Sequence, residues 1–223
     1  MLRKIIKDTI ITYRHKKWVK ILRGGVENTN FTIVSNNCSA GFIYHDLGIK
    51  FQTPTINLFF SPEDYLEFIE NLRYYKECEL VELENSNRDY PVGVLKAKDT
   101  KHKDIIVYFQ HYLNFYDAKS KWIERYNRIN WDNLYFIFEF YDTLYNNELM
   151  YKFDALNLKN KVMLVHKKEL CFKNSFYISC YDNDYPIAKI FEINYKTGKR
   201  YLDEFDYVGF LNGKGIRENR SKK

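Results

Sequence analysis

Apolar and basic positions alternate at helical spacing over residues 2–23. Two sets of apolar side chains recur three, four or seven residues apart: Ile6, Ile10 and Tyr13, and Ile11, Trp18 and Leu22. Gly24 and Gly25 follow, and glycine readily adopts the left-handed conformation that ends a helix. The pattern predicts an N-terminal amphipathic helix. It either packs on the domain with a solvated basic face, or lies on an anionic membrane with Trp18 and the isoleucines at the headgroup boundary.

Beyond the glycines, short apolar runs alternate with helical patterns. A buried strand over 31–34 leads into the polar turn 35–41, and Ser61 and Pro62 open a later helix as its cap and first residue. Further strands are predicted at 53–60, 104–110, 134–140, 161–165, 176–180 and 187–193, and further helices at 61–78, 117–129, 143–156 and 201–211. The alternation predicts an α/β fold: a mostly parallel, Rossmann-like sheet with helices on both faces. The last two strands are expected to be antiparallel edge strands near the C-terminus.

The composition is that of a folded protein with an uneven charge. A hydrophobic fraction of 45%, with 18% aromatic residues, excludes a disordered chain. The formal charge is +6, but residues 1–24 carry a net +7 and residues 212–223 a net +4, which leaves −5 for residues 25–211. A nucleic-acid-binding domain would interleave basic residues with its core, so no nucleic-acid partner is expected. We divide the chain accordingly into a basic helix (1–24), a single α/β domain (25–211) and a basic tail (212–223).

Several classes of site are not predicted. The four cysteines form no C-x-x-C pair and no histidine stands at zinc-ligand spacing, so neither a metal site nor a disulfide framework is expected. Glycine-rich phosphate loops and the Gly-x-Ser-x-Gly motif do not occur, and no cofactor is evident. Asp182 and Asp184 flank an asparagine as in metal-binding acid pairs, but their position before Tyr185-Pro186 is typical of a turn. With no export signal and no long apolar run, we expect a cytoplasmic protein, peripheral at the inner membrane face.

Cys38 is the strongest candidate for chemistry. It lies in a turn at a predicted helix start, where backbone N–H groups and the helix dipole stabilise a thiolate and lower its pKa. His111 ends another predicted strand and is the candidate base, expected at the same sheet edge. His45 is seven residues on, about 10 Å along a helix, and therefore too far for a direct bond. The alternative is that Cys38 is a small buried residue that packs a tight turn.

Candidate substrate-binding residues fall into two groups. Ser35, Asn36 and Asn37 precede Cys38, and the amides either hold a reacting carbonyl or simply form the turn; Asn57, in the next predicted strand, is a further candidate. The second group shares one face of the predicted helix at 117–129 and consists of Lys121, Arg125 and Arg128. Such a face either binds a diphosphate or a phosphate-bearing carrier, or is solvated, with Glu124 neutralising part of the charge.

Several motifs occur in order between residues 30 and 165. They are Ile33-Val-Ser-Asn-Asn-Cys38 with Gly41 and Tyr44, Thr53-Pro-Thr-Ile-Asn-Leu58, the helix start at Asp64-Tyr65, Tyr90-Pro-Val-Gly93, and His111-Tyr112 followed by Ala118, Trp122, Arg125 and Arg128. In these motifs the chain resembles a bacterial family whose members are usually labelled exopolysaccharide or capsular polysaccharide biosynthesis proteins. The resemblance implies a role in assembling or decorating surface glycans, and it supplies no mechanism.

Three hypotheses follow from the residues and the resemblance together. In the first, an acyltransferase modifies a glycan or lipid-linked glycan, with Cys38 as nucleophile, His111 as base and the Asn36-Asn37 turn holding the carbonyl of an activated acyl donor. In the second, a glycosyltransferase uses the cationic helix face to bind the diphosphate of a sugar nucleotide. In the third, the protein is a non-catalytic scaffold of the assembly machinery.

Overall fold

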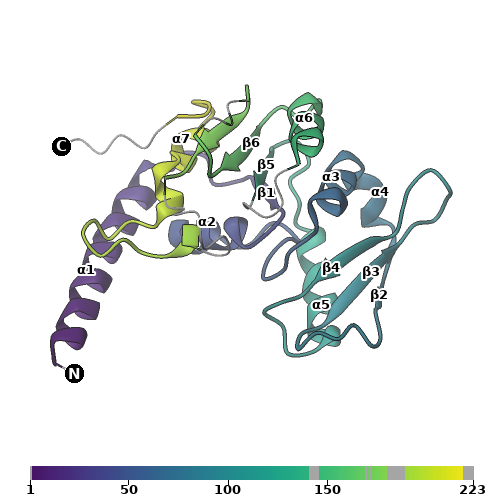
Figure 1. Ribbon diagram of the computed structural model, residues 1–223, viewed down its shortest axis with the longest axis horizontal. Helices are drawn as coiled ribbons and strands as arrows, with labels where there is room; N and C mark the ends of the chain where they lie inside the picture. The colour runs from purple at the N-terminus through teal and green to yellow at the C-terminus, as the bar shows by residue number, and fades with distance from the viewer. Residues whose placement is uncertain (1, 141–145, 169, 171, 180–188, 218–223) are drawn as a thin grey trace.

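A four-stranded parallel sheet forms the centre of the computed structural model, which describes residues 2–140, 146–168, 170, 172–179 and 189–217, with side chains from residue 6 onward (Figure 1). Its strands, in spatial order, are β1 (Thr32–Ser35), β5 (Leu134–Glu139), β6 (Lys161–Val165) and β7 (Ser175–Tyr177). Every neighbouring pair is parallel, with Val34 opposite Phe136 and Phe138 opposite Met163. The predicted parallel sheet is therefore confirmed.

Helices cover both faces of this sheet because successive side chains of a strand point to opposite faces. Ile33, Ile137 and Leu164 pack in a core with α1 (Leu2–Gly25), α2 (Ser39–Leu47) and α7 (Tyr207–Leu211). The alternate side chains Val34, Phe138 and Met163 pack in a second core with α3 (Pro62–Glu70) and α6 (Asn147–Ala155). β1, β5 and β6 are buried on both faces, which explains why they read as apolar runs rather than alternating ones.

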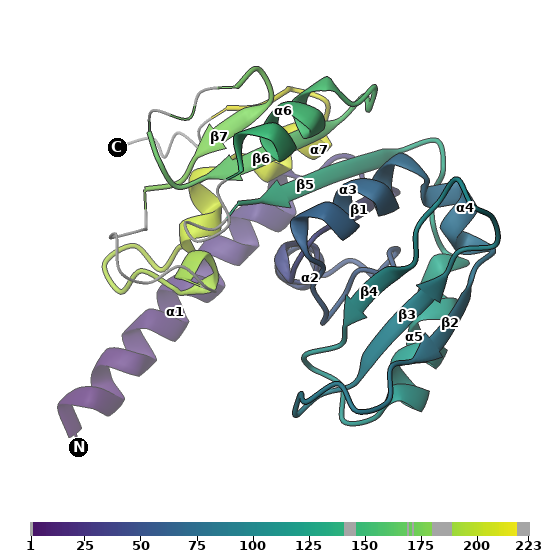
Figure 2. The same cartoon turned by 45° about the vertical axis from the view of Figure 1, so that its right-hand side comes forward.

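A smaller antiparallel sheet lies beside the second core (Figure 2). It consists of β2 (Glu79–Glu82), β3 (Val92–Lys96) and β4 (Ile105–Tyr108), with α4 (Leu72–Lys76) and α5 (Phe115–Tyr126) nearby. Residues 97–104 join β3 to β4, and a connection this short permits only antiparallel pairing. The strand predicted at 104–110 thus exists but belongs to this sheet. The strand predicted at 53–60 is reduced to one bridge, between Phe59 and Tyr108.

The C-terminal region departs in part from expectation. β7 extends the main sheet in parallel, and near the C-terminus the described residues show antiparallel pairing only as a bridge between Ile193 and Arg200. The helix predicted at 201–211 is split into the 3-10 turn η3 (Tyr201–Glu204) and α7, preceded by the 3-10 turn η2 (Lys189–Phe191). Part of the predicted strand at 187–193, like residues 218–223 of the basic tail, lies outside the described residues.

The predicted helix boundaries have clear local causes. The Ser61 hydroxyl accepts a hydrogen bond from the Asp64 N–H at 3.1 Å, with Pro62 as the first residue of α3. Gly48 ends α2 at a φ of +70°, in the left-handed region that favours glycine. The helix predicted from residue 143 begins at Asn147, and residues 143–145 lie outside the described residues.

The N-terminal helix α1 has two apolar faces rather than one. Ile11, Trp18 and Leu22 lie on the side that packs on the domain, where the Trp18 indole N–H donates to Asp203 at 2.8 Å. The other set is exposed to solvent. It includes Ile21, which is about three helical turns after Ile10 and so lies on the same side. The exposed set is Ile6, Ile10, Tyr13 and Ile21. The start of the helix projects from the body of the molecule (Figures 1 and 2). Trp18 is therefore unavailable as a membrane anchor. No helix in the described part of the chain is long and apolar enough to span a membrane.

Candidate functional site at the carboxyl edge of the parallel sheet

The turn after β1 is held together by its own polar side chains. The Ser35 hydroxyl donates to the Asn37 carbonyl at 2.6 Å and accepts from the Ala40 N–H at 3.1 Å, while the Asn37 side-chain oxygen accepts from the Ser39 N–H at 2.9 Å. Cys38 is the residue immediately before α2, as predicted. The turn-forming role of these residues is thus realised, and it fixes Cys38 at the carboxyl edge of the sheet.

Asn36 links this turn to the neighbouring strand. Its amide donates to the Glu139 carbonyl at 3.0 Å and accepts from the Glu139 N–H at 3.0 Å, so that the side chain continues the hydrogen-bond ladder between β1 and β5. The Asn37 amide donates to the Glu139 carboxylate. Both amides therefore help to position Glu139.

A buried Glu139–His166 pair lies at the centre of the site. Glu139 ends β5 and is 1% exposed, and His166 follows β6 and is 7% exposed. Their Oε1 and Nε2 atoms are 3.2 Å apart. Buried ionisable groups are costly unless paired and hydrogen-bonded, and this pair meets that condition with help from Asn37.

Neither Glu139 nor His166 is among the residues predicted from the sequence. A signal for both exists, because each follows an apolar run at the carboxyl end of a predicted strand: Glu139 ends β5, and His166 comes directly after Val162–Val165 of β6. Ligands of open parallel sheets bind at that edge. Their adjacency, however, depends on β5 pairing with β6, which the sequence does not reveal.

The environment of Cys38 differs from the expected one. Burial, reinforced by the negative charge of Glu139, raises the pKa of the Cys38 thiol to about 11. The prediction of a lowered pKa is therefore wrong, because desolvation of the thiolate exceeds the stabilisation available at the start of α2. The thiol is protonated at neutral pH, and any nucleophilic role requires a base.

The predicted base His111 follows a strand of the other sheet, not of the sheet that carries Cys38. It follows β4, which belongs to the antiparallel sheet, and its exposed side chain has no interaction with Cys38 in the described part of the structure. Its backbone N–H donates to the carbonyl of Asn57 at 3.4 Å, so His111 and Asn57 do lie together. Asn57 is exposed at a φ of +62°, a turn conformation that asparagine tolerates.

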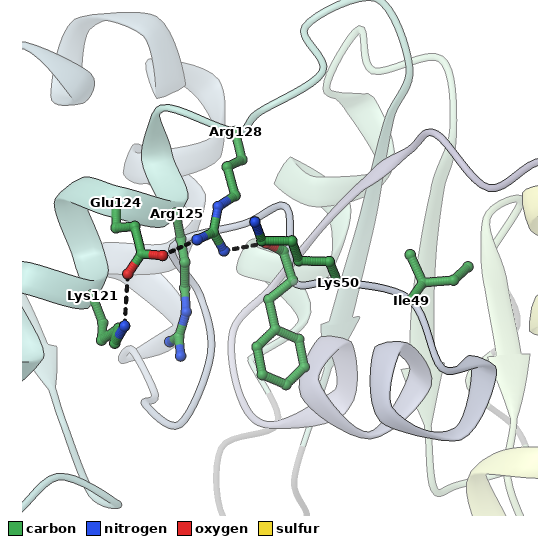
Figure 3. Close-up of a pocket in the computed structure, with 7 residues that line it drawn as sticks. Ile49, Lys50, Lys121, Glu124, Arg125 and Arg128 are labelled. Carbon is green, nitrogen blue, oxygen red and sulfur yellow. Dashed lines mark hydrogen bonds and ion pairs between the residues drawn. The ribbon is translucent and has the colours of Figure 1, made fainter.

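The cationic residues of α5 and of the turn that follows it line a separate pocket (Figure 3). Lys121, Arg125 and Arg128 are indeed on one face, opposite the segment 49–51 that follows α2. Cys38 precedes α2 and this segment follows it, so the nine residues of α2 separate them by about 14 Å along the helix axis. The candidate residues thus form two separate sites.

The described residues contain no group of three His, Cys, Asp or Glu side chains that could hold a metal ion. Asp182 and Asp184, with Cys171 and Cys180, lie outside the described residues. Cys38 and Cys78 are free cysteines in the part of the chain that is described.

Fold and site together define an α/β protein in which a parallel sheet, covered by helices on both faces, presents a buried Glu–His pair and a cysteine at its carboxyl edge. Sequence comparison shows that the chain belongs to the family named domain of unknown function (DUF1919), which matches residues 10–212. It is also 34% identical, over 193 residues, to an uncharacterized protein of Haemophilus influenzae (strain ATCC 51907 / DSM 11121 / KW20 / Rd). The alignment covers 86% of this chain and 89% of that protein.

Proposed function

We propose that the protein is an acyltransferase of bacterial surface-polysaccharide biosynthesis, with Cys38 as nucleophile and the Glu139–His166 pair as the group that accepts its proton. The observation that carries this proposal is the hydrogen bond from Asn37, the residue before Cys38, to the Glu139 carboxylate, which brings the turn of the half-buried thiol against the buried pair. A nucleophile, a base and a group that orients the base are the parts that covalent acyl transfer requires.

The proposed reaction proceeds through a thioester on Cys38. The Cys38 Sγ attacks the carbonyl carbon of an activated acyl donor, and its proton passes to the Glu139–His166 pair. A thioester forms on Cys38, the donor bond breaks, and the leaving group takes up the proton. A sugar hydroxyl then attacks the thioester, its proton passes to the same pair, and Cys38 leaves as the thiol after taking that proton back. Asn37 donates a hydrogen bond to the Glu139 carboxylate and so positions it for both steps.

The acceptor is proposed from the sequence motifs. The ordered motifs that include Cys38, Asn57 and His111 resemble those of exopolysaccharide and capsular polysaccharide biosynthesis proteins, and a glycan hydroxyl is the acceptor that such a role supplies. The cytoplasmic, membrane-peripheral location expected from the sequence agrees with a glycan or lipid-linked glycan as substrate.

Two measurements on Glu139→Gln test the proposal because they are expected to change in opposite directions. The background keeps Cys38 as the single cysteine, through Cys78→Ser, Cys171→Ser and Cys180→Ser. With a pKa of about 11, about one Cys38 thiol in a thousand is ionised at pH 8. Glu139→Gln removes the negative charge, so alkylation by iodoacetamide at pH 8 should become faster. Acylation of Cys38 by acetyl-coenzyme A or p-nitrophenyl acetate should become slower by on the order of 100-fold, as measured by mass spectrometry of the intact protein.

The controls separate chemistry from folding. Glu63→Gln changes an exposed acid in the first turn of α3 and should leave both rates unchanged. Cys38→Ala should abolish the acyl adduct. An acylation rate that is equal in Glu139→Gln and the parent, or a parent that forms no adduct with either donor, would show that Cys38 only packs the turn.

We also propose that α1 binds the anionic inner membrane surface through its solvent-facing set, Ile6, Ile10, Tyr13 and Ile21. The helix carries a net charge of +7 over residues 1–24, which complements anionic lipid. Ile6→Asp with Ile10→Asp should weaken binding to phosphatidylglycerol vesicles at least tenfold in a flotation assay. Ile123→Asp on α5 is the matched control, since Ile123 and Ile6 are each 51% exposed. Equal binding by the double variant and the parent would return α1 to a purely structural role.

A further inference from the structure

Arg125 is a buried cation without an acidic partner. It is 8% exposed, and within the described part of the chain it forms no ion pair with a carboxylate. Its Nη1 donates to the Tyr112 hydroxyl at 2.6 Å, and its guanidinium carbon lies 5.2 Å from the centre of the Phe51 ring. The hydroxyl and the aromatic ring carry no negative charge, so the guanidinium keeps its full positive charge for an anion.

The other side chains of the pocket add to this positive charge. The cavity has a volume of about 330 Å³ and is lined by four cations and one acid: Lys50, Lys121, Arg125, Arg128 and Glu124. Glu124 already pairs with Lys121, at 2.7 Å, and with Arg128. The pocket therefore keeps three positive charges in excess of its one acid.

The geometry orients these groups toward one space. Figure 3 shows Glu124 between Lys121 and Arg128, with Arg125 beside them and the segment that carries Lys50 opposite. Arg128 also donates to the Phe51 carbonyl at 3.2 Å, which fixes the position of that segment against α5. The pocket is thus built on a rigid helix and on a loop that is tied to it.

We infer that this pocket binds a diphosphate group. Arg125 presents the planar, forked donor that matches phosphate oxygens in a bidentate manner, and Lys121 and Lys50 supply point charges on either side. A carboxylate would neutralise one of the three excess charges, whereas a diphosphate neutralises two or three. The site lies at the opposite end of α2 from Cys38, so the inference stands independently of the proposed acyl transfer.

Titration calorimetry of the full chain with inorganic pyrophosphate tests the inference. Arg125→Gln should weaken binding by tenfold or more, and Lys119→Gln, which changes the same charge on the same helix away from the pocket, should leave it within twofold. Because Arg125 is buried, the double variant Lys50→Gln/Lys121→Gln, which alters exposed residues, gives a second test and should weaken binding at least tenfold.

Further titrations distinguish the possible sources of the diphosphate, and a variant of Glu139 distinguishes diphosphate binding from the proposed acyl transfer. UDP-glucose and farnesyl diphosphate, titrated in parallel, distinguish a soluble sugar nucleotide from a lipid-linked carrier, and tighter binding of either one than of pyrophosphate supports the site. Glu139→Gln should bind pyrophosphate like the parent, so that failure of acyl transfer leaves this result intact. Absence of heat with pyrophosphate, or equal losses in Arg125→Gln and Lys119→Gln, would overturn the inference.

Discussion

Replacement of Asp46 by alanine is expected to lower the free energy of unfolding by about 3–5 kcal/mol, the cost of removing one partner from a buried ion pair. Asp46 lies in α2 and is 2% exposed. Its carboxylate accepts from Arg200 at 2.8 and 3.3 Å, and the ring of His15, on α1, lies 3.7 Å away. Without the carboxylate, the half-buried Arg200 guanidinium loses its counter-charge.

The pKa values of Asp46 and His15 reflect the same contacts. Burial alone would raise the pKa of Asp46, but the hydrogen bonds from His15 and Arg200 outweigh it and hold the pKa well below its ordinary value. The bond to Asp46 in turn raises the pKa of His15, against the effect of burial. The stability contributed by Asp46 is therefore present above the carboxyl's unfolded pKa and is lost as the pH falls through its folded pKa.

Urea denaturation at pH 7, followed by tryptophan fluorescence, measures the effect of Asp46→Ala. Asp132→Ala is the matched control, since Asp132 is exposed and the change should stay within about 0.5 kcal/mol of the parent. A loss below 1 kcal/mol for Asp46→Ala would mean that water replaces the carboxylate around Arg200 and that the cluster adds little to the stability of the fold.

The second large effect concerns Asp203, whose replacement by asparagine should remove a pH-dependent loss of stability. Burial raises the pKa of Asp203 to about 6, despite the N–H groups of Arg200 and Trp18 that favour its charged form. Since the folded pKa lies above the unfolded value of 3.8, the folded state binds the proton more tightly. The contribution is fully present below the unfolded pKa and is lost as the pH rises through 6. The loss amounts to about 3 kcal/mol for a shift of about two pKa units.

Asp203→Asn keeps an oxygen that can accept both N–H groups and has no proton to lose. The difference in unfolding free energy between Asp203→Asn and the parent should therefore grow by roughly 2–3 kcal/mol, in favour of the variant, between pH 4 and pH 7.5. Urea titrations of both proteins across this range measure the difference and cancel the titration of all other groups. A difference that is the same at both ends would show that Asp203 stays charged in the fold.

Local patterns in the sequence predicted the local structure well. The cap at Ser61 and the strand that leads into Cys38 follow from residue types within a few positions of one another. The shared face of Lys121, Arg125 and Arg128 follows from helical spacing alone, and the pocket confirms that these residues lie together.

Features that depend on which strands pair could not be predicted in the same way. The expectation that His111 shares the sheet edge of Cys38 is wrong, because the strand before it could join either sheet and only its hairpin with β3 decides between them. The proximity of Glu139 and His166 requires the order β5-β6, and the pKa of Cys38 depends on how deeply the turn is buried. Likewise, helical spacing located both apolar faces of α1 but could not tell which one packs on the domain.

The pairing of β1 with β5 has a consequence for how the protein folds. The two strands are neighbours in the sheet, yet residues 36–133, including the whole antiparallel sheet, lie between them in the chain. Closing a loop of this length costs on the order of 4 kcal/mol in chain entropy, whereas the hairpin of β3 and β4 closes over residues 97–104 at a much smaller cost. We therefore expect the antiparallel sheet to form early and the β1–β5 contact late. Cys38 and Glu139 would then meet only in the last stage of folding, and a chain trapped before that stage would have secondary structure without the site.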